Sequence, residues 1–257
     1  MIRVDAIPAF EDNYIWLLSA AGSQPSRDAV VVDPGTAEPV IACLERLQLR
    51  LTAILITHHH DDHCGGITAL TRHTPVPVYG PLRPGLPISH PLHDGDRLTV
   101  LPGLELAVIS VPGHTRDHLA YYGGEMLFCG DTLFAGGCGR VFEGDSAQLY
   151  QSLTRLATLP ETTRIYCAHE YTLDNLAFAR QVEPDNQALQ QRLARVRDLR
   201  ATGQATIPSL LAEEHLTNPF LRCAVPDVHH AVEHFSGKSP ASPQEVFKIL
   251  RYWKDTF

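Results

Sequence analysis

A short run of histidine and aspartate has the residue types and the spacing of a metal site. It reads His58-x-His60-x-Asp62-His63 and directly follows the apolar residues 53–56, which predict a buried strand. In an extended chain alternate side chains face the same side, so His58 and His60 can bind one ion together. As the chain turns into the next helix, Asp62 and His63 can face a second ion. Imidazole and carboxylate groups suit zinc, iron or manganese.

Three more potential ligands, His114, Asp131 and His169, each follow a run of residues that predicts a strand. In open α/β layers ligands usually bind at the edge where such strands end, so we expect all seven side chains to meet there. Seven ligands over two ions leave room for water, which indicates a catalytic rather than a structural site. Two ions about 3.5–4 Å apart need a shared ligand, for which we choose the carboxylate of Asp131 together with a hydroxide. Each histidine alone could be structural, so this hypothesis depends on the whole set.

The elements that must position these side chains change in kind along the sequence. Up to about residue 170, apolar runs bounded by glycine and proline predict strands, and helical periodicity appears between them. The strands are expected at 29–32, 53–56, 106–111, 126–129 and 164–167, and the helices at about 38–48 and 145–158. From about residue 171 the pattern predicts helices. These are expected at about 172–182, 185–201, 208–215 and 242–256.

The last of these helices has a full start signal in the sequence. Ser242 is a good N-cap, Pro243 fits the first helical position, and Glu245 completes a capping box. We therefore predict a mixed α/β domain over residues 1–170, followed by a small helical domain over residues 171–257.

Composition and charge argue against several kinds of partner. The 257 residues carry a formal net charge of -8, which makes a nucleic-acid partner unfavourable. No apolar run approaches the roughly 20 residues that cross a membrane, and the first residues lack a signal-peptide pattern. The six cysteines form no CxxC pair, which suits free thiols in a reducing compartment. We therefore expect a cytoplasmic monomer with no nucleic-acid partner and no membrane partner.

The seven potential ligands follow the pattern of the metallo-β-lactamase superfamily. Within it, the chain resembles the glyoxalase II (hydroxyacylglutathione hydrolase) family over essentially its whole length. The motifs that carry this narrower resemblance are Asp12-Asn13-Tyr14, Gly130-Asp131-Thr132-Leu133-Phe134, Gly137-Cys138-Gly139-Arg140, His169-Glu170-Tyr171-Thr172, Asn218-Pro219-Phe220-Leu221-Arg222 and Arg251-Tyr252-Trp253-Lys254-Asp255. The resemblance implies an α/β fold, an αββα metallo-β-lactamase-like sandwich with the metals at one edge, followed by a small all-α C-terminal domain. That superfamily hosts many reactions, so the fold alone does not give the substrate.

The resemblance also implies a ligand set and a reaction. The first metal would be bound by His58, His60 and His114, the second by Asp62, His63 and His169, and Asp131 would bridge them. The implied cofactors are two divalent metal ions per chain, with zinc as the first choice and iron or manganese as alternatives. Asp62 and Asp131, with the bridging hydroxide, are the predicted catalytic groups. The implied reaction cleaves the thioester of S-D-lactoylglutathione to glutathione and D-lactate, the second step of methylglyoxal detoxification.

The same resemblance assigns glutathione, a small-molecule substrate group, to Arg140, Tyr171, Arg251 and Lys254. Arginine and lysine are natural receptors for the glycine carboxylate of glutathione. Arg251 and Lys254 are three residues apart and share a helix face, although a solvated cationic helix end would look the same. One departure stands out: the family commonly has tyrosine two positions after the basic residue, where this chain has Phe142. We expect weaker substrate binding from this change, not a different reaction.

Several neighbouring residues receive minor roles. The candidates to orient the ligands are His59, Asp61, Asp33 and His118. A second group of histidines, at positions 229, 230 and 234, lacks a carboxylate at metal spacing and is read as structural or solvated. Cys64 and Cys138 are read as small buried residues, because a metal-bound hydroxide already supplies the nucleophile.

Three other functions compete with the hydrolase. A glutathione persulfide dioxygenase with one iron would share His58, His60, His114 and Asp131. The full second-metal set and the basic C-terminal helix favour the hydrolase over it. A β-lactam hydrolase is disfavoured by the missing signal peptide and the glutathione-type C-terminus. A non-catalytic metal-binding protein is disfavoured by the complete ligand set.

Overall fold

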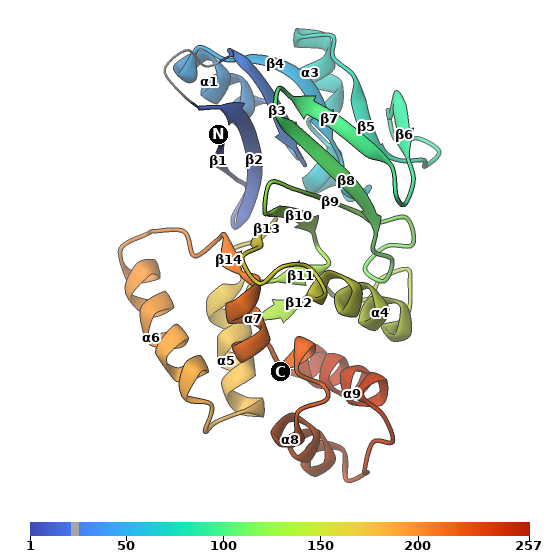
Figure 1. Cartoon of the computed structure of the whole chain (residues 1–257), viewed down its shortest axis with the longest axis vertical. Helices are drawn as coiled ribbons and strands as arrows, with labels where there is room; N and C mark the ends of the chain where they lie inside the picture. Colours follow the sequence, from blue (N-terminus) through green and yellow to red (C-terminus); the bar gives the residue numbers. More distant parts are fainter. Residues whose placement is uncertain (22–25) are drawn as a thin grey trace. The chain divides into compact units, whose positions relative to one another are not determined.

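The computed structural model of the protein describes residues 1–21 and 26–257, and its chain divides into two units (Figure 1). The first unit is Met1–Ser110 with Asp117–Gly130, and the second is Val111–Arg116 with Asp131–Phe257. The predicted ligands are therefore divided between the two units. The run from His58 to His63 lies in the first unit, and His114, Asp131 and His169 lie in the second.

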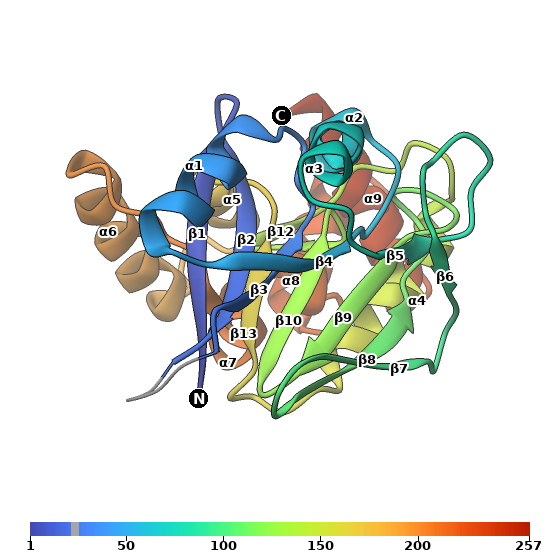
Figure 2. The same cartoon turned by 90° about the horizontal axis from the view of Figure 1, so that it is seen from above.

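The first unit contains a six-stranded sheet with parallel and antiparallel parts (Figure 2). Its strands, in spatial order, are β1 (Ile2–Ala9), β2 (Asn13–Ala20), β3 (Asp28–Val32), β4 (Arg50–Leu55), β5 (Val78–Pro81) and β6 (His90–Leu92). The first three are antiparallel neighbours, and β3 to β6 are parallel. Parallel neighbours need a crossover, and helices supply two of them. These are α1 (Glu38–Leu47) between β3 and β4, and α2 (Asp61–Cys64) with α3 (Ile67–His73) between β4 and β5.

One face of this sheet packs against α1 and α3. Buried side chains of the strands, such as Leu17, Val31 and Ile54, form one cluster with Val40 of α1 and Ile67 of α3. The alternating strand residues Val30 and Val32 are also buried, so the central strands are covered on both faces. This two-sided burial holds the ends of β3 and β4 in place, and the histidine-rich run begins there.

A second group of strands in the first unit is antiparallel throughout. It consists of β7 (Arg97–Leu101), β8 (Leu104–Ser110), β9 (Leu119–Gly123) and β10 (Met126–Gly130). The Tyr121 hydroxyl of β9 donates to the Ile56 carbonyl oxygen at 2.6 Å. The Leu119 amide donates to the Thr57 carbonyl oxygen at 2.9 Å. These two bonds join the start of β9 to the end of β4, so they fix His118 beside the histidine run.

The second unit is mostly helical and contains a few short strands. Its strands are the hairpin β11 (Leu133–Phe134) and β12 (Gly137–Cys138), and the antiparallel pair β13 (Arg164–Cys167) and β14 (Ser209–Leu210). Its helices are α4 (Ser146–Ala157), α5 (Thr172–Val182), α6 (Gln187–Ala201), α7 (Leu211–Thr217), α8 (Pro226–Ser236) and α9 (Pro243–Thr256), with a 3-10 turn η1 (Pro219–Leu221) before α8. No helix in the described part of the chain has the length and apolar character of a membrane span.

The strands predicted from sequence are confirmed as β3, β4, β8, β10 and β13, and the change to helices after about residue 171 is confirmed by α5 to α9. The helix expected at 208–215 begins later, at Leu211, because Ser209–Leu210 pairs with β13 as β14. The N-cap of α9 is Ser242 as predicted, but the Glu245 carboxylate accepts from the Ala241 amide instead of the Ser242 amide. The domain boundary between residues 170 and 171 stays a prediction.

Candidate functional site

Three histidine rings and one carboxylate of the first unit meet just after β4. His58 Nε2 and His60 Nδ1 are 3.0 Å apart, and the ring centroids of His58 and His63 are 4.0 Å apart. His63 Nε2 lies 3.4 Å from an Asp62 oxygen, Oδ2. His58 and His63 are fully buried, while His60 and Asp62 are partly exposed. Ring nitrogens that face one another at this distance are suited to a shared cation.

Asp33, the residue directly after β3, contacts this cluster through His63 and Thr57. Its Oδ2 atom lies 3.0 Å from His63 Nδ1 and accepts from the Thr57 hydroxyl at 2.7 Å. Its Oδ1 atom accepts from the Thr57 amide, also at 2.7 Å. Because the carboxylate engages Nδ1 of His63, it fixes the tautomer in which Nε2 offers its lone pair. The structure therefore places Asp33 in the orienting position considered for it.

The other candidates for orienting roles differ among themselves. The ring of His118 stacks on that of His58, with centroids 4.6 Å apart, and both rings are buried. His59 lies 3.6 Å from an Asp117 oxygen, and Asp61 is exposed in the first turn of α2. The His59 ring also meets the His60 ring edge-on, with centroids 4.9 Å apart. His118, Asp33 and His59 therefore each contact a predicted ligand through their own side chains.

In the second unit, Asp131 lies between two imidazoles. Its Oδ2 atom is 3.5 Å from His114 Nε2, and its Oδ1 atom is 3.4 Å from His169 Nε2. All three side chains are buried. His114 Nδ1 lies 2.7 Å from the Arg140 carbonyl oxygen, so Nε2 is the nitrogen directed at Asp131. A carboxylate that presents one oxygen to each of two imidazoles has the arrangement of a bridging ligand.

A glycine makes this close packing possible. A Cβ atom at Gly139 would lie 1.9 Å from the Asp131 carbonyl oxygen and 3.4 Å from His114 Nδ1. A side chain at this position would therefore force Asp131 away from its place, and the Gly137-Cys138-Gly139-Arg140 motif is explained in part by this contact.

A cavity of about 360 Å³ opens in the second unit beside His114 and Asp131. Its wall includes all four residues assigned to glutathione from the sequence, Arg140, Tyr171, Arg251 and Lys254, together with Phe134, Phe142 and Asp174. The Tyr171 ring stacks on the His169 ring, with centroids 4.7 Å apart. The cavity thus runs from potential metal ligands to a group of three cations.

The cations on this wall differ in how they are held. Arg251 is buried, and its Nη1 donates to the carbonyl oxygens of Cys138 at 3.0 Å and Gly139 at 3.4 Å. One oxygen of Asp255 accepts from Arg251 Nη2 at 3.1 Å and from Arg140 Nε at 3.2 Å. Asp255 therefore holds the two arginine side chains next to each other, a role that the sequence analysis missed.

Lys254 is packed differently. Its Nζ atom donates to the Asp174 carbonyl oxygen at 3.3 Å and lies 5.4 Å from the ring centroids of both Phe178 and Phe257. Burial, followed by the charge of Arg251, lowers the pKa of the Lys254 ammonium below its usual value. An anion that reaches this ammonium would relieve both effects.

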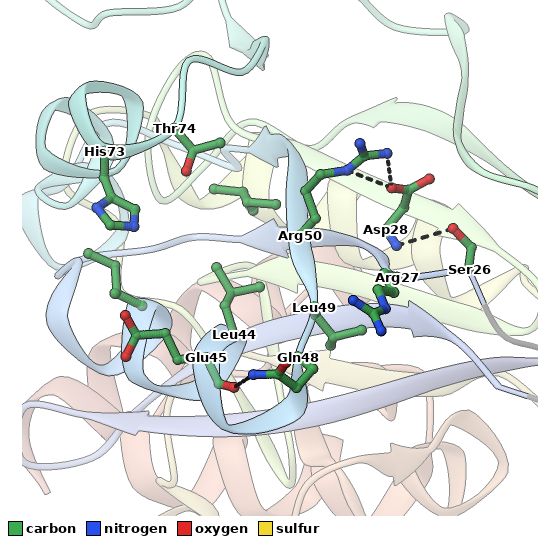
Figure 3. A pocket seen from close by; sticks show the side chains of 12 residues that line it. Ser26, Arg27, Asp28, Leu44, Glu45, Gln48, Leu49, Arg50, His73 and Thr74 are labelled. Carbon is green, nitrogen blue, oxygen red and sulfur yellow. Dashed lines mark hydrogen bonds and ion pairs between the residues drawn. The ribbon is translucent and has the colours of Figure 1, made fainter.

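A cavity larger than the one beside His114 and Asp131 lies elsewhere in the chain. The cavity of about 670 Å³ in Figure 3 lies in the first unit between α1 and the start of β4. Its rim carries Arg27, His73 and the ion pair of Arg50 with Asp28, whose atoms are 2.6 Å apart. It contains none of the predicted ligands, so the chemistry of the residues, not volume, locates the candidate site.

The cysteines are not arranged as nucleophiles. All six are buried free thiols. Burial raises the pKa of both Cys64 and Cys138 to about 11, so both stay protonated at neutral pH. This agrees with the interpretation of these residues as small buried side chains. In the second histidine group, His229 Nε2 lies 2.9 Å from the Pro240 carbonyl oxygen, which is a structural contact.

Comparison with known proteins supplies the family. The family model described as "Hydroxyacylglutathione hydrolase C-terminus" matches residues 170–257. The model described as "Metallo-beta-lactamase superfamily" matches residues 16–100 and 83–169. The hydroxyacylglutathione hydrolase of Alkalilimnicola ehrlichii is 55% identical over 257 residues, which cover 99% of both chains. That of Aeromonas salmonicida is 52% identical over 260 residues, which cover 100% of both. The chain belongs to the hydroxyacylglutathione hydrolase family.

Solved structures agree with the fold expected of that family. ETHE1 from Myxococcus xanthus is 28% identical with a TM-score of 0.67, covering 98% of this chain and 91% of that one. BLEG-1 B3 metallo-beta-lactamase is 25% identical with a TM-score of 0.61, covering 86% and 99%. The predicted metallo-β-lactamase fold with a helical C-terminal region is thus confirmed. Identities above 50% to hydroxyacylglutathione hydrolases favour this family over the rival functions.

Proposed function

We propose that the protein hydrolyses the thioester of S-(2-hydroxyacyl)glutathione, with S-D-lactoylglutathione as substrate and glutathione and D-lactate as products. In this role it would carry out the second step of methylglyoxal detoxification. One observation supports the proposal most directly: Asp131 lies between His114 and His169, beside a cavity with three cations, in a chain of this family.

The donor set fits two divalent metal ions. All seven groups are imidazoles or carboxylates, and no thiolate competes with them. We propose that His58, His60 and His114 hold one ion, that Asp62, His63 and His169 hold the other, and that Asp131 bridges them. The contact of His63 with Asp33 and that of His114 with the Arg140 carbonyl oxygen support these roles, because each leaves Nε2 as the coordinating nitrogen.

The residues of the chain divide the work of the reaction. Asp131 and Asp62 would help to hold the two ions, which would supply Lewis-acid chemistry by lowering the pKa of a bound water and polarising the thioester carbonyl. When the C–S bond breaks, glutathione would leave as a thiolate. Because the pKa of its thiol is about 8.5, it departs with little help from a general acid. The proposed departure of glutathione therefore requires no general acid among the described residues beside the cavity.

Arg140, Tyr171, Arg251 and Lys254 would bind the glutathione part. Lys254 and Arg140 are the more accessible cations, and the glycine carboxylate of glutathione is the group that they would pair with. Arg251 lines the same cavity while it also fixes the backbone of Cys138 and Gly139. Residues on one wall of this cavity would therefore both bind the substrate and orient it.

The first test is to incubate purified protein with S-D-lactoylglutathione, to follow the loss of thioester absorbance, and to measure metal content on the same sample. Rapid hydrolysis with about two ions per chain would support the proposal. Asp62→Ala and Asp131→Ala should each lose metal and activity together, and full turnover with both ions bound would contradict their roles. No hydrolysis by a fully metallated sample would move attention to oxygen uptake with glutathione persulfide.

Metal identity, location and assembly belong to the same proposal. We place zinc first, with iron or manganese as alternatives; a related protein, TTHA1623, which is 30% identical over 65% of this chain with a TM-score of 0.54, was solved in a di-iron-bound form. Elemental analysis of the purified protein decides between them. Six free thiols support a reducing, cytoplasmic location. Light scattering after size-exclusion chromatography tests the proposed monomer.

A further inference from the structure

The hairpin β11–β12 is a very short element in a buried place. Each strand has two residues, and residues 131–139 are all buried. Two-stranded hairpins are marginal on their own even when longer. Buried backbone amides and carbonyls also need hydrogen-bond partners. The hairpin must therefore be held by groups from other elements.

Two side chains supply partners: Glu214 in α7 and Asn218, the residue directly after that helix (the helix is labelled in Figure 1). Glu214 Oε2 accepts from the Gly136 amide at 2.8 Å, at the tip of the hairpin. Asn218 Nδ2 donates to the Gly137 carbonyl oxygen at 2.9 Å and to the Phe134 carbonyl oxygen at 3.3 Å. Asn218 Nδ2 is also 3.0 Å from Glu214 Oε2, so the two side chains act as one group.

Glu214 is a fully buried carboxylate that is compensated by a buried arginine. Its Oε1 atom accepts from Arg192 Nη2 at 2.5 Å, and Arg192 Nη1 donates to the Thr217 hydroxyl at 2.6 Å. Burial lowers the pKa of Arg192, but the charge of Glu214 and its hydrogen bond outweigh burial and raise it overall. Such a pair adds little to stability compared with apolar residues of similar volume, whereas removing one partner alone leaves a buried charge without compensation.

The hairpin, in turn, contacts one predicted ligand of the second unit directly and is linked through its flanking residues to the other two. Asp131 precedes it by two residues. Two residues after it, the Arg140 carbonyl oxygen lies 2.7 Å from His114 Nδ1. The Phe134 ring meets the His169 ring edge-on, with centroids 5.9 Å apart. A displacement of the hairpin would therefore move the ligands and the cavity wall together.

We propose that Glu214 is a positioning residue for the reaction, which with Asn218 holds the β11–β12 hairpin so that Asp131, His114 and Arg140 keep their places. The proposal rests on the proposed thioester hydrolysis for its kinetic part. Its structural part, the dependence of the hairpin on Glu214, is independent of any substrate.

Glutamine cannot replace this glutamate. The carboxylate uses both oxygens as acceptors, one for Arg192 and one for the Gly136 amide and Asn218. A glutamine has a single acceptor oxygen, so its amide group must face either the guanidinium or the Gly136 amide, donor against donor. Glu214→Gln therefore loses one of the two contacts while it keeps the shape of the side chain.

The test compares Glu214→Gln and Asn218→Ala with Glu213→Gln as the matched control. Glu213 is the neighbouring, partly exposed carboxylate, which pairs with Arg195 and with Arg192 Nε but has no described contact with the hairpin. Hydrogen exchange of residues 131–140 is measured on the metal-loaded proteins, with kcat and KM for S-D-lactoylglutathione. We expect Glu214→Gln to raise exchange there about tenfold or more and to lower kcat/KM about 10–100-fold.

Asn218→Ala should change the same segment in the same direction, and Glu213→Gln should stay within about twofold of the wild type in both measurements. Wild-type exchange of residues 131–140 in Glu214→Gln, or an equal effect in Glu213→Gln, would overturn the proposal. Should Glu214→Gln not fold, Asn218→Ala decides by the same criterion. A wild-type protein without thioesterase activity would count against the proposed function alone, because the exchange measurement still tests the hairpin.

Discussion

His63 Nδ1 lies 3.0 Å from Oδ2 of Asp33, and both side chains are almost completely buried. The same carboxylate also accepts hydrogen bonds from the amide and the hydroxyl of Thr57. Asp33 thus connects the end of β3 to the start of the histidine run, and it directs Nε2 of His63 away from itself. We expect the metal affinity of the site to depend on this contact.

The first prediction is that Asp33→Asn lowers metal affinity by about 10–100-fold, because a neutral amide supports the imidazole less well and offers one acceptor oxygen in place of two. Metal retained against a competing chelator measures the effect. Asp28→Asn is the matched control, since Asp28 begins the strand that Asp33 directly follows but pairs with Arg50 at the surface. Equal metal retention in Asp33→Asn and the wild type would contradict the assigned role.

The second prediction concerns Lys254. Lys254→Met should raise KM about 10–100-fold with little change in kcat, because a charge-assisted hydrogen bond to the substrate carboxylate contributes about 1.5–3 kcal/mol. Lys248→Met is the control, an exposed lysine on the same helix that does not line the cavity. With the glycinamide analogue of the substrate, which lacks the carboxylate, wild type and Lys254→Met should have similar KM values. A persistent difference on the amide would show that Lys254 acts on something else.

The third prediction is a pH dependence of the same contact. Burial lowers the pKa of Lys254 below its ordinary value of 10.5, so the ammonium loses its proton earlier than an exposed lysine as pH rises. The charged form binds the carboxylate and is the form present at lower pH. The ratio of kcat/KM between wild type and Lys254→Met should therefore fall towards one on the alkaline side. Taking the ratio cancels the titration of the substrate itself, and a ratio that stays constant to pH 10 would rule the explanation out.

The fourth prediction is resistance to thiol alkylation. A thiol with a pKa of about 11, as for Cys64 and Cys138, is a thiolate in on the order of one molecule in three thousand at pH 7.5. Treatment with iodoacetamide under native conditions should leave activity almost unchanged. The same treatment after unfolding in denaturant, which exposes all six thiols, is the control for reagent quality. Rapid loss of activity in the folded protein would mean that a cysteine near the site is accessible and acidic.

The local part of the site could be predicted from the sequence because its geometry is local. The spacing of His58 and His60 places them on one side of an extended chain, and the structure has their ring nitrogens 3.0 Å apart. A positive φ of 52° at Asp33, by contrast, is a property of the folded loop, and the contact of Asp33 with His63 spans 30 residues. The sequence could therefore indicate Asp33 only as a candidate near the site, and it could not predict the contact with His63.

Contacts between distant segments account for most of what was missed. Arg251 and Lys254 look alike as two cations on one helix face, yet the structure buries Arg251 against the Cys138 and Gly139 carbonyl oxygens. A spacing of three residues does not indicate which of the two cations donates hydrogen bonds to backbone carbonyl oxygens. Asp255 could have been found from its i, i+4 relation to Arg251, but its second contact, with Arg140, joins residues 115 positions apart.

The last prediction concerns Phe142, at the position where the resemblance to the family implies a tyrosine. Its ring meets the His114 ring edge-on, with centroids 5.2 Å apart, and its side chain is 61% exposed on the wall of the cavity. A hydroxyl added to an exposed ring causes no overpacking and supplies one more donor beside the glutathione site. Phe142→Tyr should therefore lower KM about three- to tenfold, the effect of one hydrogen bond of about 0.5–1.5 kcal/mol, and leave kcat nearly unchanged.

Phe142→Leu is the companion variant, because it removes the ring and adds no hydroxyl. If the ring supports His114, Phe142→Leu should lower kcat, whereas Phe142→Tyr keeps the ring and should not. An unchanged KM in Phe142→Tyr would mean that the missing hydroxyl costs nothing in this chain. Another donor of the cavity, such as Tyr171 or Arg140, would then already make the corresponding bond.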